Sequence, residues 1–240
     1  MHPARTIHPQ AGRIRLFAVL LALLFVPAEL KAAESRAYNS FPETIDRAAK
    51  YLIYLHGRNV ELKNDGRTPP GPNFDFAGIK AAFVSLGFTV IAESRTADTL
   101  VPHYARHVAE QVRRLMASGV APRNIVVAGY SKGGAIALFA AALHRASDLR
   151  TIVMAGCGRE GSPFGSGYAK FLAQLAPRLE GRLLSIYDEA DDKFGTCGRA
   201  FAAAPQAAGE EVVVRTGRGH FLFYTPQAAW LDPVKKWLDR

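Results

Sequence analysis

The sequence is poor in cysteine and has few long apolar runs. Two cysteines in 240 residues are too few for the disulfide framework of a small secreted miniprotein. The one stretch apolar enough to concern a membrane, Leu16–Val26, has eleven residues, whereas a helix needs about 20 to cross a bilayer. Hydrophobic residues make up 49% and charged residues 21%. These values exclude a disordered chain, a collagen-like chain and a coiled coil.

Signatures of cofactor sites are also missing. No cluster of His, Cys and Asp has the spacing of metal ligands, and no G-x-G-x-x-G follows a predicted strand. We therefore predict no metal and no other cofactor. The net charge is +9, but the basic residues do not cluster with aromatic residues. The pairs Arg113-Arg114 and Lys235-Lys236 fall in amphipathic helical patterns, so we do not expect nucleic acid as a partner.

Residues 1–32 have the order of a secretory signal peptide. Residues 1–15 contain three arginines and no acid, and the apolar run 16–26 ends at Pro27, before small residues. Cleavage after Ala28 or Ala32 would leave a mature N-terminus between Glu29 and Ala33. In the latter case 208 residues would remain, with 26 basic and 20 acidic side chains and a charge of +6. We expect a secreted or periplasmic protein without a stable membrane span. An uncleaved membrane anchor and a buried helix are the alternatives for this segment.

The rest of the chain alternates between strand and helix patterns. A loop is expected over residues 58–73, where Pro69, Pro70, Gly71 and Pro72 lie close together. Single helices between strands imply a doubly wound, mostly parallel α/β sheet in one domain, residues 33–240. Reactive groups in such sheets lie outside the carboxyl ends of the strands. Strands are expected at 51–55, 88–92, 124–128, 151–155, 182–187 and 211–215, and helices at 79–86, 100–118, 133–145, 168–179 and 226–239.

The segment Gly129-Tyr-Ser131-Lys-Gly133 lies between a predicted strand and a predicted helix. G-x-S-x-G in this context is typical of a nucleophile elbow, in which a serine occupies a sharp, strained turn. The residues two before and two after the serine must be very small, because larger side chains would collide. The N-terminus of the following helix favours a developing oxyanion. The alternative is a serine in an ordinary glycine-rich turn that binds phosphate.

Four features in order make the chain resemble the α/β-hydrolase superfamily over about residues 50–240. They are His56-Gly57 after a strand, the Ser131 elbow, an acid after a later strand, and His220 after the last strand. Serine, acid, histidine is the order in which that superfamily places its triad. The chain is most similar to small secreted bacterial members with a G-Y-S-K-G elbow. The resemblance implies an α/β-hydrolase fold and a Ser-His-Asp triad.

His220 is the predicted general base. It follows the strand at 211–215 through the flexible loop Thr216–Gly219, at the carboxyl edge of the sheet. His56 belongs to the His-Gly dipeptide that shapes the oxyanion loop in the family. The other five histidines lie in the signal region or on predicted helices.

The acid follows the strand at 182–187, where Asp188, Asp191 and Asp192 stand close together. The family commonly has a G-x-x-D turn here, with the acid in the fourth place. In that register Asp191 is the acid, and Asp188 replaces the glycine. Asp192 lies one residue beyond. Asp188 and Asp192 remain the alternatives.

The resemblance also implies an oxyanion hole made by two backbone N–H groups. One is that of Lys132, the residue after the nucleophile. The other follows His56-Gly57 and belongs to Arg58, with Asn59 as the alternative. A Ser-Lys dyad with the Lys132 ammonium is disfavoured, because adjacent residues in such an elbow point in different directions.

Cys157 follows the strand at 151–155, and Cys197 follows the strand at 182–187. These strands are consecutive, so both cysteines are expected at one edge of the sheet. In an exported protein this placement favours a disulfide, which would tie down the acid-bearing loop. The alternative is two free thiols.

The distance between Gly158 and the next strand, 23 residues, leaves no room for a large lid. We expect an open site framed by residues 58–75 and 159–167, with apolar walls from Phe74, Phe76, Phe164 and Tyr168. The leading function is a serine hydrolase that cleaves a carboxylic ester of a small-molecule acyl substrate through an acyl-enzyme. Amide and thioester cleavage use the same machinery. The alternatives are a hydrolase-like domain that binds a ligand without chemistry, and an acyltransferase that excludes water.

Overall fold

The computed structural model describes residues 1, 36–144 and 146–240, so the expected signal peptide at residues 1–32 lies outside the described residues apart from Met1. Over the described part of the chain, seven strands form one sheet, and every neighbouring pair of them is parallel. The doubly wound α/β fold expected from the sequence is therefore confirmed. In spatial order the strands are β1 (Ala37–Tyr38), β3 (Phe88–Ile91), β2 (Lys50–Leu55), β4 (Ile125–Tyr130), β5 (Arg150–Met154), β7 (Gly181–Asp188) and β9 (Ala207–Val214).

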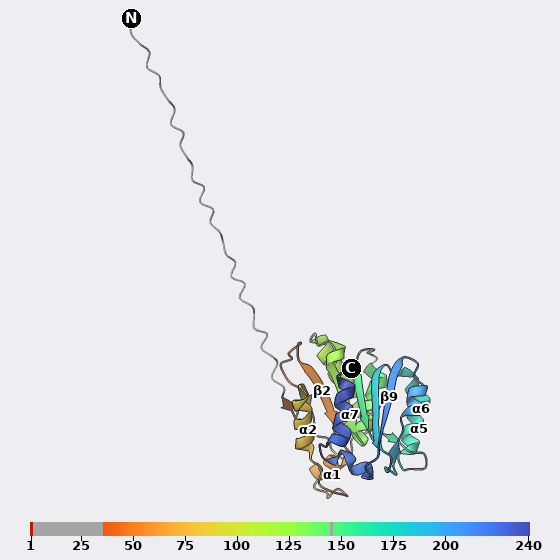
Figure 1. The fold of residues 1–240 in the computed structure, drawn as a ribbon. Coiled ribbons are helices and arrows are strands. Elements are labelled where there is room, and N and C mark those ends of the chain that lie inside the picture. Colours follow the sequence, from red (N-terminus) through yellow and green to blue (C-terminus); the bar gives the residue numbers. More distant parts are fainter. Residues whose placement is uncertain (2–35, 145) are drawn as a thin grey trace. The chain divides into compact units, whose positions relative to one another are not determined.

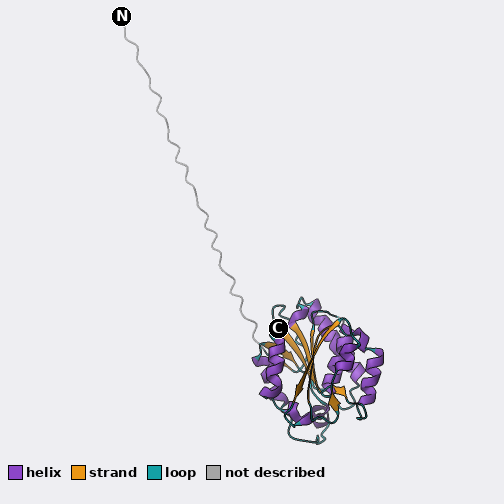
Figure 2. Cartoon of the chain, turned by 45° about the vertical axis from the view of Figure 1, so that its right-hand side comes forward, coloured by secondary structure: helices purple, strands orange, loops and turns teal. Residues whose placement is uncertain are grey.

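Helices cover both faces of this sheet (Figures 1 and 2). On one face α2 (Phe76–Ser85) and α7 (Ala228–Leu238) bury Phe83 and Trp230 against Leu52 and Tyr54 of β2. The other face is covered by α3 (Val101–Ala117) and α4 (Lys132–His144), followed along the sheet by α5 (Gly165–Gln174) and α6 (Gly198–Ala202). Three short 3₁₀ turns join these elements: η1 (Pro122–Asn124), η2 (Ala176–Arg178) and η3 (Gly219–Tyr224).

The centre of the molecule is formed by β4 and α4. All six residues of β4 are buried, which agrees with its continuous apolar run, since a parallel strand is covered on both faces. The helix α4 is rich in alanine and lies between α3 and the sheet. Its small side chains let it approach closely, so the turn between β4 and α4 is held in place by the packed core.

The predicted loop at 58–73 is wrong for its first part, because Arg58–Asn64 form the helix α1. The prolines and glycine that suggested a loop stand at 69–72, beyond the end of this helix. Gly57 precedes α1 in an extended conformation as its N-cap, and Glu61 is buried in its first turn. The short strands β6 (Cys157–Gly158) and β8 (Phe194–Gly195), which pair antiparallel, were not expected from the sequence, nor was α6.

In the described ranges, none of the helices combines the length and apolarity needed to cross a bilayer.

Candidate active site

The turn between β4 and α4 has the strained geometry of a nucleophile elbow. Ser131 has a φ of 56°, in the left-handed region that side-chain-bearing residues rarely adopt. A methyl group on Gly129 would lie 2.1 Å from the carbonyl oxygen of Gly133, and one on Gly133 would lie 2.0 Å from that of Leu55. Both positions therefore require glycine. The start of α4 thus packs directly on the backbone at the end of β2.

The structure brings Ser131, His220 and Asp191 together at the carboxyl edge of the sheet. The Ser131 Oγ atom lies 2.9 Å from His220 Nε2. On the other side of the ring, His220 Nδ1 lies 2.7 Å from Asp191 Oδ2. The three side chains thus form one continuous chain of hydrogen bonds. They come from the end of β4, the loop after β7 and the 3₁₀ turn after β9.

Asp191 is buried, and its carboxylate is fully supplied with donors. Its Oδ1 atom accepts the backbone N–H groups of Lys193 and Phe194, at 2.9 and 3.0 Å, while Oδ2 faces His220. Burial alone would raise the pKa of this carboxyl group, but the hydrogen bond from His220, its charge and the two backbone donors together lower it. Asp191 is therefore ionised next to the imidazole.

The two alternative acids have other surroundings. Asp188 is buried and accepts hydrogen bonds from the Ala190 N–H and from the Thr216 N–H and hydroxyl, so it fixes the start of the loop that leads to His220. Asp192 is exposed to solvent. Of the three candidates, Asp191 is the one whose carboxylate lies within hydrogen-bond distance of the His220 ring.

Two aromatic residues that sequence reasoning did not single out hold the His220 ring. Phe194 stacks on the imidazole with ring centroids 4.8 Å apart and an angle of 16° between the planes. Tyr130 lies on it at 5.0 Å, and the Tyr130 hydroxyl donates to the His220 carbonyl oxygen at 3.0 Å. Neither position has a recognisable pattern in the sequence, although Tyr130 is part of the G-x-S-x-G segment.

His56 is buried and uncharged. Its Nε2 atom accepts the backbone N–H of Arg95 at 3.1 Å, so the proton resides on Nδ1, which donates to the Gly57 carbonyl at 2.8 Å. Burial, followed by the positive charge of Arg95, lowers the pKa of His56 to about 3. This histidine therefore cannot serve as a base near neutral pH, and it holds the His-Gly turn in shape.

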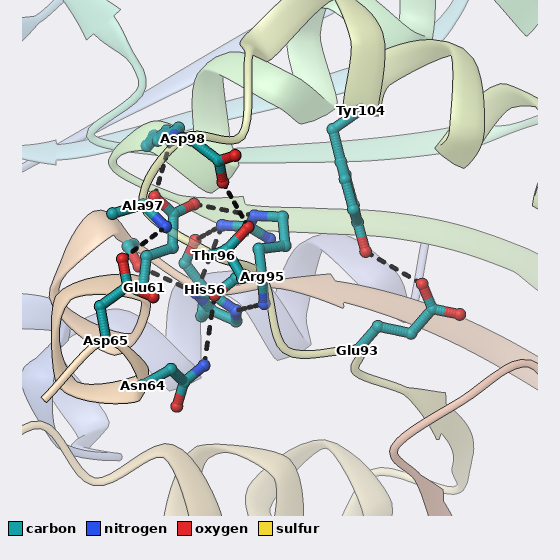
Figure 3. A network of polar contacts seen from close by, with 12 residues as sticks. His56, Glu61, Asn64, Asp65, Glu93, Arg95, Thr96, Ala97, Asp98 and Tyr104 are labelled. Carbon is teal, nitrogen blue, oxygen red and sulfur yellow. Dashed lines mark hydrogen bonds and ion pairs between the residues drawn. The ribbon is translucent and has the colours of Figure 1, made fainter.

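The predicted oxyanion donors lie at the starts of two helices. Arg58 is the first residue of α1 and Lys132 the first of α4, and both line the pocket beside Ser131. Asn59, the alternative donor, is buried in the first turn of α1. The Lys132 ammonium lies 2.6 Å from the carboxylate of Glu61, so its side chain is directed to that group. Glu61 also binds Arg95, in the polar network shown in Figure 3, and neither residue was a candidate from the sequence.

A pocket of about 700 Å³ opens beside Ser131. Phe164 and Tyr168 line it, as expected, together with Phe194. Phe74 and Phe76 are not among its walls. Phe74 instead stacks on Tyr130, because the chain after α1 folds beneath the elbow. The expected frame is therefore corrected in part. Residues 58–75 contribute Arg58, and the expected segment 159–167 contributes Pro163, Phe164, Ser166 and Gly167. Residues 97–102, which sequence reasoning missed, also line the pocket. Apolar side chains of three elements complete the pocket: Leu100, Val101, Ala135, Leu138, Phe139 and Phe171.

The loop that carries Asp191 is held by a disulfide, by Arg159 and by the pairing of β6 with β8. Cys157 and Cys197 form a disulfide with their Cα atoms 5.4 Å apart, as the sequence led us to expect. The guanidinium of Arg159 donates to the carbonyl oxygens of Asp191 and Phe194, at 2.6 and 3.1 Å. These contacts, with the pairing of β6 and β8, hold the acid at a fixed place opposite His220.

As to metals, the residues that the structure describes contain no group of three or more His, Cys, Asp or Glu side chains placed to hold an ion.

No protein-family model matches the chain, and no curated protein is found to be similar to it. Solved structures do match its fold. A lipase-esterase related protein from Clostridium acetobutylicum has a TM-score of 0.52 at 14% identity, over 82% of this chain and 96% of that one. SOBER1 from Arabidopsis thaliana has a TM-score of 0.51 at 15% identity, over 80% of this chain and 99% of that one. Est1E from Butyrivibrio proteoclasticus has a TM-score of 0.50 at 15% identity, over 83% of this chain and 89% of that one. These likenesses show that the chain has the α/β-hydrolase fold.

Proposed function

We propose that the protein is a serine hydrolase that cleaves carboxylic esters through an acyl-enzyme. The observation that carries this proposal is the hydrogen-bonded chain from Ser131 through His220 to Asp191, which begins at a strained elbow. A buried, ionised carboxylate orients the imidazole, and the imidazole is in place to take the serine proton. The esterase-related description of one fold neighbour is in keeping with this chemistry.

The reaction follows from these positions. Ser131 Oγ attacks the ester carbonyl carbon while His220 Nε2 takes its proton, and Asp191 stabilises the resulting imidazolium. The backbone N–H groups of Lys132 and Arg58 receive the negative oxygen of the tetrahedral intermediate. The intermediate collapses, and the alcohol leaves with the proton from His220. Water then attacks the acyl-enzyme carbonyl carbon while His220 takes its proton. The second intermediate collapses, the carboxylic acid leaves, and Ser131 regains its proton from His220.

The pocket beside Ser131 supports an ester with an apolar acyl group. Its walls are mainly aliphatic and aromatic, and Leu138 and Phe139 of α4 follow Ser131 along one side. Burying methylene groups against such walls is favourable by about 0.8 kcal/mol each. An octanoyl ester should therefore have a higher kcat/KM than an acetyl ester of the same alcohol.

The order of residues 1–32 and the disulfide support the further proposal that the protein works outside the cytoplasm, in the periplasm or the medium.

The proposal is tested with purified protein and p-nitrophenyl acetate and octanoate. We expect hydrolysis of both esters by the wild type and loss of both activities in Ser131→Ala. Ser118→Ala, which changes an exposed serine at the end of α3, is the matched control and should keep full activity. Folded wild-type protein that hydrolyses neither ester, while still binding octanoate, would favour a ligand-binding domain instead.

A further inference from the structure

Glu61 is a fully buried acid held between two cations. One carboxylate oxygen lies 3.0 Å from Arg95 Nε, whose side chain is also fully buried. The other lies 2.6 Å from Lys132 Nζ, whose side chain is 16% exposed. Burial of a lone carboxylate is costly, so Glu61 depends on its charge-assisted hydrogen bonds to Arg95 and Lys132. We call these three side chains the Glu61 junction. This junction is not used by the Ser131–His220–Asp191 chain.

The junction joins the two segments on which the oxyanion hole depends. Glu61 lies three residues after Arg58, in the same helix α1. Lys132 directly follows the nucleophile and begins α4. One carboxylate thus connects the first turns of both helices, and their backbone N–H groups are the two proposed donors.

Arg95 fixes the same junction to the end of β2. Its guanidinium donates to the His56 carbonyl oxygen, and its backbone N–H donates to the His56 ring at 3.1 Å (Figure 3). His56 and Gly57 lead directly into α1. Glu61 therefore connects three chain segments. They are the His56-Gly57 segment before α1, the segment of Arg95 after β3, and the start of α4 at Lys132.

The charge of this cluster also suits an oxyanion. Arg95 and Lys132 are positive and Glu61 is negative, so the three side chains together leave one positive charge beside the nucleophile. The positive end of the α4 dipole also lies beside Ser131, since Lys132 is the first residue of that helix.

From these contacts we propose that Glu61 and the Lys132 side chain are positioning residues that hold the two oxyanion donors at the correct separation. The inference rests on the proposed hydrolase function. Glu61 does not touch the substrate in this account. It acts through Lys132 and α1, and breaking its contact with Lys132 weakens stabilisation of the tetrahedral intermediate while leaving binding of the ground-state ester unchanged.

Lys132→Met tests this, because it leaves the backbone N–H and the Glu61–Arg95 pair in place. With p-nitrophenyl acetate we expect kcat to fall by about 10-fold to 100-fold, less than the 10²–10³ that loss of a whole oxyanion donor costs. KM should change by less than about threefold. The inhibition constant of phenylboronic acid, which forms a tetrahedral adduct with Ser131, should rise by the same factor as kcat falls. Lys132→Arg should recover most of the activity. Lys63→Met, which removes an exposed cation of α1, the helix that carries Glu61, should match the wild type.

The outcomes separate the two proposals. A wild type that hydrolyses the ester, with Lys132→Met equal to it in kcat and in inhibition by phenylboronic acid, overturns the positioning role alone. A rise in KM with unchanged kcat overturns it too and makes Lys132 a ground-state binding residue. If Lys132→Met does not fold, Lys132→Gln and Lys132→Arg are compared, and equal kcat values in these two variants and the wild type overturn the role. A folded wild type without any hydrolysis overturns the proposed function itself.

Discussion

Two buried carboxylates near Ser131, those of Asp191 and Glu61, have partners of different kinds. The side chains of Asp191 and Glu61 are both completely buried. Asp191 faces one histidine and two backbone N–H groups. Glu61 faces two basic side chains, those of Arg95 and Lys132. The first carboxylate faces an imidazole, which is charged only when protonated, whereas the second faces a guanidinium and an ammonium group.

In the proposed mechanism, this difference separates a carboxylate that stabilises a transient imidazolium from one that holds the structure. Asp191 faces a neutral imidazole, so in the proposed mechanism its negative charge is available to stabilise the imidazolium that forms when His220 takes the serine proton. The charge of Glu61 is compensated at all times, so it cannot respond to the reaction. Substitution of Asp191 should therefore change the rate more than the stability, and substitution of Glu61 should strongly change the stability.

The largest effect is expected for Asp191→Asn. The amide would stabilise the wrong tautomer of His220, and in serine protease triads this change lowers turnover by roughly 10⁴. We expect a loss of that order in ester hydrolysis, with the fold intact by circular dichroism. Asp188→Asn and Asp192→Asn should lose far less. Near-full activity in Asp191→Asn, with loss in either neighbour, would move the acid to that neighbour.

Glu61→Gln should mainly destabilise the protein. It leaves the buried Arg95 and the mostly buried Lys132 without a countercharge, and breaking such a pair costs about 3–5 kcal/mol in the free energy of unfolding. Urea denaturation measures this cost. Glu110→Gln, which breaks an exposed pair with Arg113, is the matched control and should cost less than about 1 kcal/mol. Equal effects of the two substitutions would remove the distinction between the Glu61 junction and a surface ion pair.

Loss of the disulfide should affect the Asp191 side of the site and spare the Glu61 side. The double variant Cys157→Ser and Cys197→Ser opens a link between residues 40 positions apart. We expect unfolding to become easier by about 2–4 kcal/mol. In hydrogen exchange, the backbone amides of residues 189–194 should lose more protection than those of α1. The opposite order would mean that the disulfide does not fasten the acid-bearing loop.

Buried histidines should make the stability depend on pH. The pKa of His56 is lowered to about 3 and that of His144 to about 4, mainly by burial. An unfolded histidine has a pKa of about 6.5, so below that pH the unfolded chain binds protons that the folded chain does not. The free energy of unfolding should thus decrease as the pH falls from 6.5 towards 4, by about 1.4 kcal/mol per pH unit for each histidine. His144→Leu should remove one such contribution. An identical pH slope in His144→Leu and the wild type would contradict this.

The sequence was sufficient to predict the sheet, the elbow and the residues that meet at Ser131, because these depend on local signals. A G-x-S-x-G between a strand and a helix is typical of a sharp, strained turn, and residues after parallel strands meet at one edge of the sheet. Glu61 and Arg95 have no such signal. Arg95 and Lys132, the partners of Glu61, lie 34 and 71 residues from it in the chain, so only the tertiary fold brings the three together. The helix α1 was missed for a related reason: it is seven residues long, and nearby prolines suggested a loop.

The pocket walls show the same limit. An aromatic residue near the site in sequence can pack beneath it, as Phe74 does against Tyr130. Phe194, in contrast, reaches His220 only because the short strand β8 turns back after Asp191. Which aromatic side chains face the substrate is decided by tertiary contacts, and no periodicity in the sequence predicts them.

The central claim is that Ser131 is a nucleophile activated by His220 and Asp191, and labelling with a fluorophosphonate tests it most directly. Intact-mass and peptide-mapping mass spectrometry would locate the adduct. We predict one probe molecule per wild-type chain, on the peptide that contains Ser131, no adduct in Ser131→Ala, and strongly slowed labelling in Asp191→Asn. Folded wild-type protein that stays unlabelled, or Ser131→Ala that is labelled as fast as the wild type, would contradict the claim.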